Sequence, residues 1–449
     1  MTQVETAVLN RRFTPAPALK GTVDVPGDKS ITHRAILFGL LSEGTTAVEG
    51  WLDAGDCRSS LQVAQALGAA VQVNSDKLSI VGTGGNLSEP SDVLDCGNSG
   101  TTTRMFLGAL AAKVPFACVT GDASLRRRPM RRVIDPLRQM GAAITARSDN
   151  FAPFAVSGQP LHGIEYTLPV ASAQVKSAVL VAGVLAKTGA TVVIEPEPSR
   201  DHTENMLRAF GADIRVERTQ NATRIAVSPN QVLKATHVKV PGDISSAAFI
   251  LAAAALVPGS HVTVRGIGLN PTRAGFLEVL KRMGANISMS NVETVAGEAI
   301  GDVTVSYGPL QGTDIAPHEV PSLIDELPIL AILGAYAAGT TTVSGAGELR
   351  VKETDRISAI VEGLTKVGVQ ASERLDGFEV LGTGGCVPGG SIDSHKDHRI
   401  AMSFAVCGLA SETAVEVRDW DCVNISYPSF LQTFERLGVS VPSVSSTGE

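Results

Sequence analysis

The chain has 449 residues, which allows two or three domains, and its hydrophobic fraction of 44% is enough for sizeable cores. Aromatic residues make up only 4% of the chain, which disfavours a platform on which nucleic-acid bases stack. The net charge of −7 has the wrong sign for a protein that holds polyanions by its overall field. An anionic ligand must therefore meet a local cluster of positive charge.

The N-terminal residues lack the apolar segment of a secretory signal. The longest apolar run, 247–257, has 11 residues, whereas a membrane span needs about 20. The six cysteines include no CxxC pair and lie mostly among apolar residues. We therefore expect buried thiols, no structural zinc, and a cytoplasmic protein with neither a membrane nor a nucleic-acid partner.

A repeated unit runs through the whole chain. Polar starts near residues 27, 97, 172, 242, 322 and 396 each precede a helix that is apolar nearly all round, and a β-branched strand follows each helix. A second, more amphipathic helix then ends at a glycine, where a C-terminal cap is expected. These glycines, 70 to 84 residues apart, are Gly68, Gly141, Gly211, Gly284, Gly368 and Gly438. The pattern predicts six units of helix, strand, loop, helix and strand.

The first and fourth units resemble each other most, with VPGDKS at 25–30 and VPGDIS at 240–245. This similarity predicts a duplicated domain of three units, with one domain at 1–26 plus 240–449, the other at 27–239, and crossovers near 26 and 240. The apolar helices would pack at each domain centre, inside the strands. Helix N-termini bind anions, so if the domains face each other, six such ends line one cleft.

Chemically active side chains gather at these helix starts and in the loops before the second helices. Guanidinium groups together with a few carboxylates suit a site that binds phosphate and carboxylate groups and moves protons. The candidates are Lys29, Ser30, Arg34, Asn98, Gly100, Thr101, Arg104, Arg126, Arg127, Arg128, Arg131, Arg132, Ser172, Gln174, Lys176, Arg200, His202, Glu204, Asn270, Arg273, Asp325, Glu326, Lys352, Glu353, Asp355, Arg356, Asp397, His398 and Arg399.

Simpler interpretations exist for several of these residues. Arg126, Arg127, Arg131 and Arg132 fit a solvated face, whereas Arg128 stands apart because Pro129 restricts the backbone beside it. Residues 352–356 fit an ordinary helix start with ion pairs, and 397–399 fit a helix cap with a surface pair. A nucleophilic Cys96 is disfavoured because no histidine lies near it in sequence.

The motifs GDKSITHR, GNSGTTTR, RRRPM, SAQVK, RDHTE, NPTR, LRVKETDR and DHRIAMSF follow one another along the chain. Together they resemble the 5-enolpyruvylshikimate-3-phosphate (EPSP) synthase family over essentially the whole length. GDKS, SAQVK, RDHTE and NPTR resemble its second sequence class, often associated with tolerance of the herbicide glyphosate. Gly100 stands where tolerant members often carry Ala, so the sequence leaves glyphosate sensitivity open.

The resemblance implies an α/β fold of two similar domains, each an inside-out barrel of three βαβαββ units with buried helices, and an active site in the interdomain cleft. It implies transfer of the enolpyruvyl group of phosphoenolpyruvate to the 5-hydroxyl of shikimate 3-phosphate, releasing phosphate through a tetrahedral intermediate. The family uses neither a metal nor an organic cofactor, and a monomer is expected.

The same resemblance assigns residues to each role. For phosphoenolpyruvate binding it implies Lys29, Gly100, Arg128, Gln174, Arg356 and Arg399. For shikimate 3-phosphate binding it implies Lys29, Ser30, Arg34, Ser172, Ala173, Gln174, Arg200, Asp325 and Lys352. Asp325 would orient or deprotonate the hydroxyl, while Glu353 and Lys29 would move the proton of the methylene carbon. Asn424 stands where some members have Lys, so it receives no cation role.

Two alternatives remain. The related UDP-N-acetylglucosamine enolpyruvyl transferases typically carry a cysteine in the loop that here reads LRRRPM and has none. A non-catalytic module that binds anions or RNA ends is the second alternative. The carboxylates of Asp325 and Glu353 favour an enzyme, because a pure anion binder gains nothing from negative charge in its site.

Overall fold

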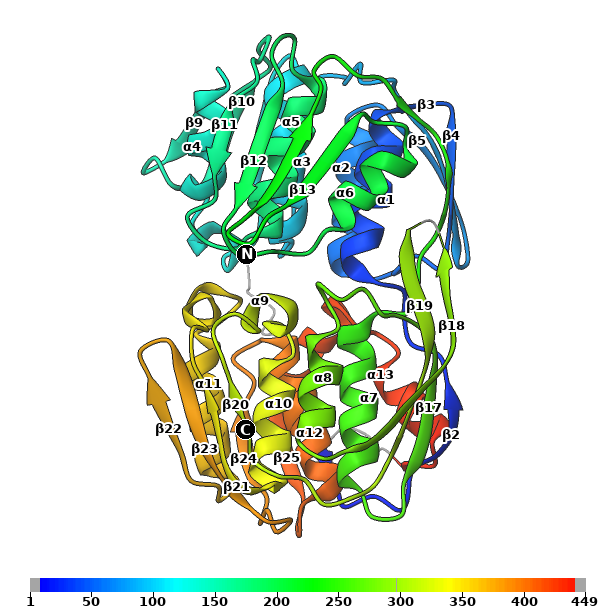
Figure 1. Cartoon of the computed structure of the whole chain (residues 1–449), viewed down its shortest axis with the longest axis vertical. Helices are drawn as coiled ribbons and strands as arrows, with labels where there is room; N and C mark the ends of the chain where they lie inside the picture. The colour runs from blue at the N-terminus through cyan, green and yellow to red at the C-terminus, as the bar shows by residue number, and fades with distance from the viewer. Residues whose placement is uncertain (1–8, 296, 441–449) are drawn as a thin grey trace, which may run out of the picture. The chain divides into compact units, whose positions relative to one another are not determined.

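The computed structural model describes residues 9–295 and 297–440, which form two compact units by their internal contacts (Figure 1). Unit 1 contains 9–26, Gly242–Glu293 and 300–440. Unit 2 contains Gly27–Pro241 together with 294–295 and 297–299. The chain passes from one unit to the other after Pro26 and after Pro241, each time directly before a glycine.

The strands of unit 2 form three four-stranded sheets and one short pair. Each four-stranded sheet contains one parallel pair, and its remaining pairs are antiparallel. The sheets are β16 (His237–Lys239), β4 (Thr45–Glu49), β6 (Lys77–Val81) and β5 (Ala70–Asn74); β7 (Leu94–Asp95), β8 (Ala117–Thr120), β10 (Phe151–Ser157) and β9 (Ala143–Arg147); and β11 (Glu165–Thr167), β12 (Thr191–Glu195), β14 (Thr223–Val227) and β13 (Ile214–Arg218). The pair is β15 (Leu233–Lys234) and β3 (Ser42–Glu43).

Unit 1 repeats this arrangement with two four-stranded sheets and one three-stranded sheet. Among the described strand pairings, each of these sheets again contains one parallel pair. The sheets are β18 (Asn286–Val295), β19 (Glu298–Ser306), β17 (His261–Gly268) and β2 (Lys20–Val23); β20 (Asp314–Ile315), β21 (Ala338–Val343), β23 (Gly377–Thr383) and β22 (Ala371–Arg374); and β1 (Arg11–Phe13), β25 (Val415–Arg418) and β24 (Gly390–Asp393). The N-terminal strands β1 and β2 therefore complete sheets formed by the C-terminal half of the chain.

Six helices are buried along most of their length, as the sequence predicts. In unit 2 they are α1 (Lys29–Leu41), α3 (Gly100–Lys113) and α5 (Ala173–Leu185). In unit 1 they are α7 (Ile244–Leu256), α10 (Leu327–Tyr336) and α12 (His398–Ala410). Figure 1 shows the strands of each unit outside these helices. The fold is thus the expected inside-out α/β arrangement.

A second helix in each repeat exposes one face. These helices are α2 (Gly55–Ala66), α4 (Arg131–Gln139), α6 (His202–Ala209), α8 (Gly275–Arg282), α11 (Arg356–Lys366) and α13 (Phe430–Arg436), and shorter helical turns are α9 (Val320–Leu323), η1 (Leu125–Arg127), η2 (Gly347–Val351) and η3 (Trp420–Ile425). The six repeat glycines follow the second helices with φ between +82° and +107°. Their left-handed backbone explains why glycine recurs there, because a Cβ disfavours this conformation.

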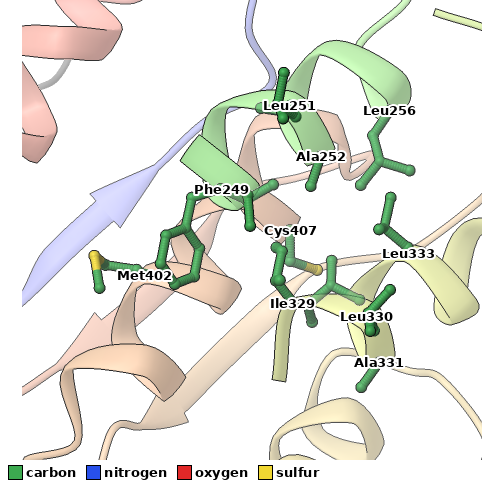
Figure 2. Close-up of a cluster of buried hydrophobic side chains, with 14 of the residues drawn as sticks. Phe249, Leu251, Ala252, Leu256, Ile329, Leu330, Ala331, Leu333, Met402 and Cys407 are labelled. Atoms are coloured by element: carbon green, nitrogen blue, oxygen red, sulfur yellow. The ribbon is translucent and has the colours of Figure 1, made fainter. Parts of the chain in front are cut away.

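Each unit has its own hydrophobic core. Figure 2 shows part of the core of unit 1, where Phe249 and Leu256 of α7 meet Ile329 and Leu333 of α10, with Met402 and Cys407 of α12 beside them. In unit 2, a Cβ on Gly108 of α3 would lie 2.2 Å from the carbonyl oxygen of Ala178 in α5. Small residues thus allow the central helices to pack closely, which accounts for the low aromatic content.

The cysteines follow the expectation of buried thiols with one clear exception. Cys57, Cys96, Cys407 and Cys422 are buried and Cys118 is half-buried, whereas Cys386 is exposed. Burial raises the pKa of Cys96 to about 12, so its thiol stays protonated and a nucleophilic role is disfavoured. Within the described parts of the chain, none of the helices combines the length and apolarity that crossing a membrane would require.

Candidate active site

In unit 2, polar side chains cap the starts of all three central helices. The caps are Asp28 on α1, Ser99 on α3 and Ser172 on α5, and each accepts a hydrogen bond from a backbone N–H of its helix, at 2.8, 3.1 and 3.5 Å. The next N–H groups of each helix start lack partners within the helix and carry partial positive charge. Directly after each of these caps lie residues that we expect to bind substrate.

The start of α1 carries Lys29, Ser30 and Arg34. Lys29 Nζ lies 3.2 Å from Oδ2 of Asp56 in α2, and its side chain is 19% exposed, so the ammonium is oriented yet accessible. The guanidinium of Arg34 is buried and donates from Nε to Oγ1 of Thr203 at 2.7 Å and from Nη2 to Oγ of Ser177 at 2.9 Å. Burial lowers the pKa of Arg34 to about 10, and Glu204 opposes this shift, so Arg34 stays charged at neutral pH.

The start of α3 places Gly100 beside two guanidinium groups. A Cβ at Gly100 would lie 3.1 Å from Nη1 of Arg104 and 3.2 Å from Nη1 of Arg128. Arg128 is anchored by Asn98, whose Oδ1 accepts from Nη2 at 2.8 Å and whose carbonyl oxygen accepts from Nη1 at 3.2 Å. The absence of a side chain at Gly100 therefore leaves room beside both guanidinium groups at the helix start.

The start of α5 joins this group through Gln174. Its Oε1 accepts from Nη1 of Arg104 at 2.7 Å, and its Nε2 donates to Oγ1 of Thr101 at 3.0 Å. Ser172 and Ala173 are half-buried beside it. Arg200, on the loop before α6, lies with Nη1 3.5 Å from Oγ of Ser30. The described contacts thus join the starts of α3 and α5 through Arg104 and Gln174, and the start of α1 with the Arg200 loop through Ser30.

In unit 1, three cations surround the carboxylate of Asp325, directly before α10. Its Oδ1 lies 3.4 Å from Lys352 Nζ and 3.5 Å from Arg356 Nη1, and its Oδ2 lies 3.9 Å from Arg399 Nη2. Arg399 Nη1 also donates to the carbonyl oxygen of Asp325 at 2.9 Å. The side chain of Asp325 is 13% exposed. A carboxylate held in this way can accept a hydrogen bond from a substrate hydroxyl.

Arg356 is buried and links the starts of α11 and α12. Its Nη2 donates to Oε2 of Glu353 at 2.7 Å, and Nε and Nη2 donate to the two carboxylate oxygens of Asp397 at 2.7 and 3.2 Å. Burial lowers the pKa of Arg356, but the carboxylates of Asp397 and Glu353 outweigh burial and raise it above the ordinary value. Arg356 therefore acts as a fixed positive charge that also orients Glu353.

A second buried network lies next to Asp325. Both carboxylate oxygens of Glu326 accept from Nη1 of Arg273, at 3.0 and 3.1 Å, and Ser245 of α7 hydrogen-bonds both side chains. Arg399 Nη1 lies 3.7 Å from Glu326 Oε1. The NPTR motif, which ends at Arg273, is thereby connected to the carboxylate next to the expected catalytic residue.

The simpler interpretations hold for some residues and not for others. Arg126, Arg127 and Arg131 are exposed, as a solvated face requires, and Arg132 is half-buried. Residues 355 and 397 do cap their helices, with Asp355 accepting from Ser358 N and Asp397 from Arg399 N. The surface pair expected as an alternative at 397–399 is wrong, because all three side chains are buried. Asn424 is exposed in η3.

Sequence reasoning missed Asp56 and Glu195. Asp56 orients Lys29, and Glu195 at the end of β12 binds Nζ of Lys176 at 2.9 Å. Asp56 lies in the first turn of an amphipathic helix, where an acidic residue is common and carries no special signal. Glu195 ends a strand of otherwise β-branched residues, and a charge in that position was the available signal for a buried partner.

Comparisons with known proteins agree with this geometry. The profile of the family described as EPSP synthase (3-phosphoshikimate 1-carboxyvinyltransferase) matches residues 13–434. A 3-phosphoshikimate 1-carboxyvinyltransferase of Synechococcus sp. (strain JA-3-3Ab) is 51% identical, over 95% of this chain and 96% of its own. One from Carboxydothermus hydrogenoformans is 50% identical, over 93% of this chain and 97% of its own.

Solved structures show the same relationship. The structure of EPSP synthase from Acinetobacter baumannii superposes with a TM-score of 0.85 at 41% identity, covering 98% of this chain and all of that one. The enolpyruvyl transferase NikO from Streptomyces tendae shares the fold, with a TM-score of 0.77 at 17% identity over 98% of this chain and 99% of its own. With its motifs, fold and relatives in agreement, the chain belongs to the EPSP synthase family.

Proposed function

We propose that the side chains described above catalyse transfer of the enolpyruvyl group of phosphoenolpyruvate to the 5-hydroxyl of shikimate 3-phosphate, with release of phosphate. The chain is a transferase of the shikimate pathway, which leads to chorismate and the aromatic amino acids. Both substrates are anions, and an anionic ligand calls for local cations in a chain whose net charge is −7. The described helix starts supply those cations.

In unit 2, the helix starts and their cations bind phosphate and carboxylate groups. Shikimate 3-phosphate is bound by Lys29, Ser30, Arg34, Ser172, Ala173, Gln174 and Arg200. Lys29 and Arg128, with Gly100 and Gln174, bind phosphoenolpyruvate. Guanidinium groups held in place by neighbouring protein groups suit this task, since their orientation is fixed before phosphate binds. The support is the hydrogen bonding of Arg34, Arg104 and Arg128 described above.

The observation that carries the proposal is the group of carboxylates among cations in unit 1. Asp325 lies within 3.5 Å of both Lys352 and Arg356, and Glu353 lies 2.7 Å from Arg356. A simple anion-binding module gains nothing from these carboxylates, whereas a proton-transfer reaction needs them. Asp325 and Lys352 also bind the shikimate ring substituents, and Arg356 and Arg399 bind phosphoenolpyruvate.

The reaction proceeds by addition and elimination. A proton adds to the methylene carbon of phosphoenolpyruvate, the adjacent carbon becomes cationic, and the 5-hydroxyl oxygen attacks it while Asp325 accepts the hydroxyl proton. The tetrahedral intermediate then loses a proton from its methyl group and expels phosphate, which restores the double bond in the product. Glu353 and Lys29 carry the proton to and from this carbon.

The experiment is a phosphate-release assay on the purified chain. Phosphoenolpyruvate with shikimate 3-phosphate should release phosphate, and phosphoenolpyruvate with UDP-N-acetylglucosamine should not. The reverse selectivity would assign the chain to the other enolpyruvyl transferases. Binding of both anions without turnover would instead support a non-catalytic module.

We also propose that the chain acts as a monomer in the cytoplasm, as the sequence suggests. Each unit has its own hydrophobic core, which supports folding without a partner subunit. Light scattering coupled to size-exclusion chromatography should give a mass near the 46.6 kDa of one chain. A mass of twice that value would contradict the monomer.

A further inference from the structure

Three charged side chains are buried together in unit 2 and have no role in the proposed reaction. Lys176 of α5 is fully buried, and its Nζ lies 2.9 Å from Oε2 of Glu195 and 2.7 Å from Oε1 of Glu204. Glu195 ends β12, which packs against α5, and Glu204 lies in the first turn of α6 (Figure 1). Lys176 and Glu204 belong to the motifs SAQVK and RDHTE, so this buried triad accounts for residues that substrate contacts leave unexplained.

Stability alone is a weak reason for such a triad. Moving a charged group out of water costs several kcal/mol, and apolar residues of similar volume are often equally good or better for stability. What the triad does provide is a fixed geometry, because each of its members sits on a different element. The triad joins α5, the end of β12 and the start of α6 at one point.

One consequence concerns the loop that carries Arg200. Ser199 immediately precedes Arg200, and its hydroxyl and carbonyl groups are bound to the triad. Its hydroxyl donates to Oε1 of Glu195, and its carbonyl oxygen accepts from Nζ of Lys176 at 3.4 Å. Residues 196–201 form neither helix nor strand, so these side-chain contacts hold the loop in place of a backbone ladder.

The other consequence concerns Arg34. The two hydroxyl groups that hold its guanidinium belong to Ser177 and Thr203, the chain neighbours of Lys176 and Glu204. These hydroxyl groups also hydrogen-bond each other at 2.6 Å. A shift of α5 against α6 would separate the two acceptors, and the ion pair between Lys176 and Glu204 opposes that shift.

We propose that Lys176, Glu195 and Glu204 are positioning residues that hold Arg34 and Arg200 in the geometry needed to bind the phosphate of the acceptor substrate. The inference rests on the proposed function, which assigns both arginines to shikimate 3-phosphate. The proposed function assigns no substrate contact to the triad, whose three side chains are buried. The triad removes the need to order the Arg200 loop when the ligand binds, and preorganisation of this kind raises affinity.

The test uses Ser199→Ala, which removes one hydrogen bond to the triad and leaves all three charges paired. Ser228→Ala is the matched control, because Ser228 Oγ donates to Oδ2 of Asp213 at 2.6 Å on the exposed surface of the same unit. Loss of a hydrogen bond to a charged group predicts that KM for shikimate 3-phosphate rises about tenfold. KM for phosphoenolpyruvate and kcat at saturation should change little in either variant. The melting temperature of Ser199→Ala should fall, because Glu195 loses a buried hydrogen bond, whereas that of Ser228→Ala should change little.

Glu204→Gln tests the contact between the triad and α6, where the neighbouring Thr203 holds Arg34. This variant should raise KM for shikimate 3-phosphate without raising KM for phosphoenolpyruvate. Arg200→Ala is measured beside both variants. If it raises KM for shikimate 3-phosphate while Ser199→Ala and Glu204→Gln leave that KM unchanged, the triad does not position the arginines. Equal increases in both KM values with a lowered melting temperature would show a merely structural role and overturn the inference. If Arg200→Ala itself has no effect, the proposed binding role of Arg200 is wrong and the inference falls with it.

Discussion

Arg356 and Asp397 form a buried bidentate pair in which Nε and Nη2 of the guanidinium donate to the two carboxylate oxygens at 2.7 and 3.2 Å. The two residues stand at the starts of α11 and α12, 41 positions apart in the chain. In this orientation, Nη2 of the guanidinium also donates to Glu353, and Nη1 lies close to Asp325. This contact therefore helps to position Glu353 and Asp325, two of the expected proton-transfer groups.

Asp397→Asn should disturb that arrangement while keeping the cap of α12, because Asn is also a good N-cap. Removing one member of a buried ion pair leaves Arg356 undercompensated and should lower the free energy of unfolding by about 3 kcal/mol. We expect kcat/KM for phosphoenolpyruvate to fall at least about tenfold, or 1.4 kcal/mol. Chemical denaturation and steady-state kinetics measure the two effects.

The control for this variant is Asp24→Asn. Asp24 forms a bidentate pair with Arg265 at 3.0 and 2.7 Å in the same unit, but both side chains are exposed. Exposed pairs contribute about 1 kcal/mol or less, so this variant should keep its stability and its activity. Equal losses in both variants would mean that burial of the Arg356 pair has no special effect.

Glu353→Gln should lose chemistry more than binding. The amide keeps the shape of the side chain and can still accept from Arg356, but it cannot take up or release a proton at neutral pH. General acid and base catalysis contributes about 10² to 10⁴ in rate, so kcat should fall by at least about 100-fold with small changes in both KM values. Glu362→Gln, at an exposed position of α11, is the control and should keep full turnover. Unchanged kcat in Glu353→Gln would remove its proposed role.

Gly100→Ala should weaken binding of phosphoenolpyruvate. The new Cβ would lie 3.1 Å from Nη1 of Arg104 and 3.2 Å from Nη1 of Arg128, so the guanidinium groups must shift. We expect a several-fold increase in KM for phosphoenolpyruvate. Gly308→Ala, where a Cβ meets nothing within 4 Å, is the control. A KM for phosphoenolpyruvate that stays unchanged in Gly100→Ala would contradict this steric account.

His33 predicts a pH dependence of stability. Burial, helped by Lys29 and Arg34, lowers its pKa from 6.5 to about 3, and its Nδ1 lies 2.8 Å from Oγ of Ser60. Below pH 6.5, His33 becomes protonated in the unfolded chain but stays neutral in the folded chain. The free energy of unfolding therefore falls as the pH falls from 6.5 toward 3. Because of this one histidine, the free energy of unfolding should be about 2 kcal/mol lower at pH 5 than at pH 7.

His33→Asn should reduce that loss, because an amide nitrogen can replace Nδ1 without titrating. The measurement is the melting temperature at pH 7 and pH 5. His261→Asn is the control, since its Nδ1 makes the same contact with Ser306 Oγ at 2.7 Å in an exposed position. A pH-dependent loss of stability in His33→Asn as large as that of the unaltered chain would show that His33 does not cause it.

The local parts of the fold follow from the sequence. Six apolar helices and six capping glycines recur in the expected order because burial and left-handed backbone are properties of single residues and short segments. The long-range pairings do not follow in the same way. Strand β1 pairs with β25, and β2 pairs with β17, across more than two hundred residues in each case. Neither strand is long enough to carry a pattern that identifies its partner.

The candidate site is likewise predictable from the sequence only in part. Lys29, Arg128 and Asp325 could be located from motifs at helix starts and in the loop before α4, and each contacts other polar groups of its own unit. That Arg356 is shared among three carboxylates could not be predicted, because the contacts join separate elements. The expectation of one cleft lined by both domains stays a prediction.

The most direct test of the proposed reaction is mass spectrometry of the product formed in D₂O from phosphoenolpyruvate and shikimate 3-phosphate. Addition converts the methylene group of phosphoenolpyruvate into a methyl group with one proton from solvent. Elimination then removes one of the three protons of that methyl group. The account therefore predicts an enolpyruvyl ether of shikimate 3-phosphate with deuterium in its vinyl methylene group, together with free phosphate. A transfer product without deuterium would contradict the proposed addition and elimination, and the absence of any transfer product would contradict the proposed function itself.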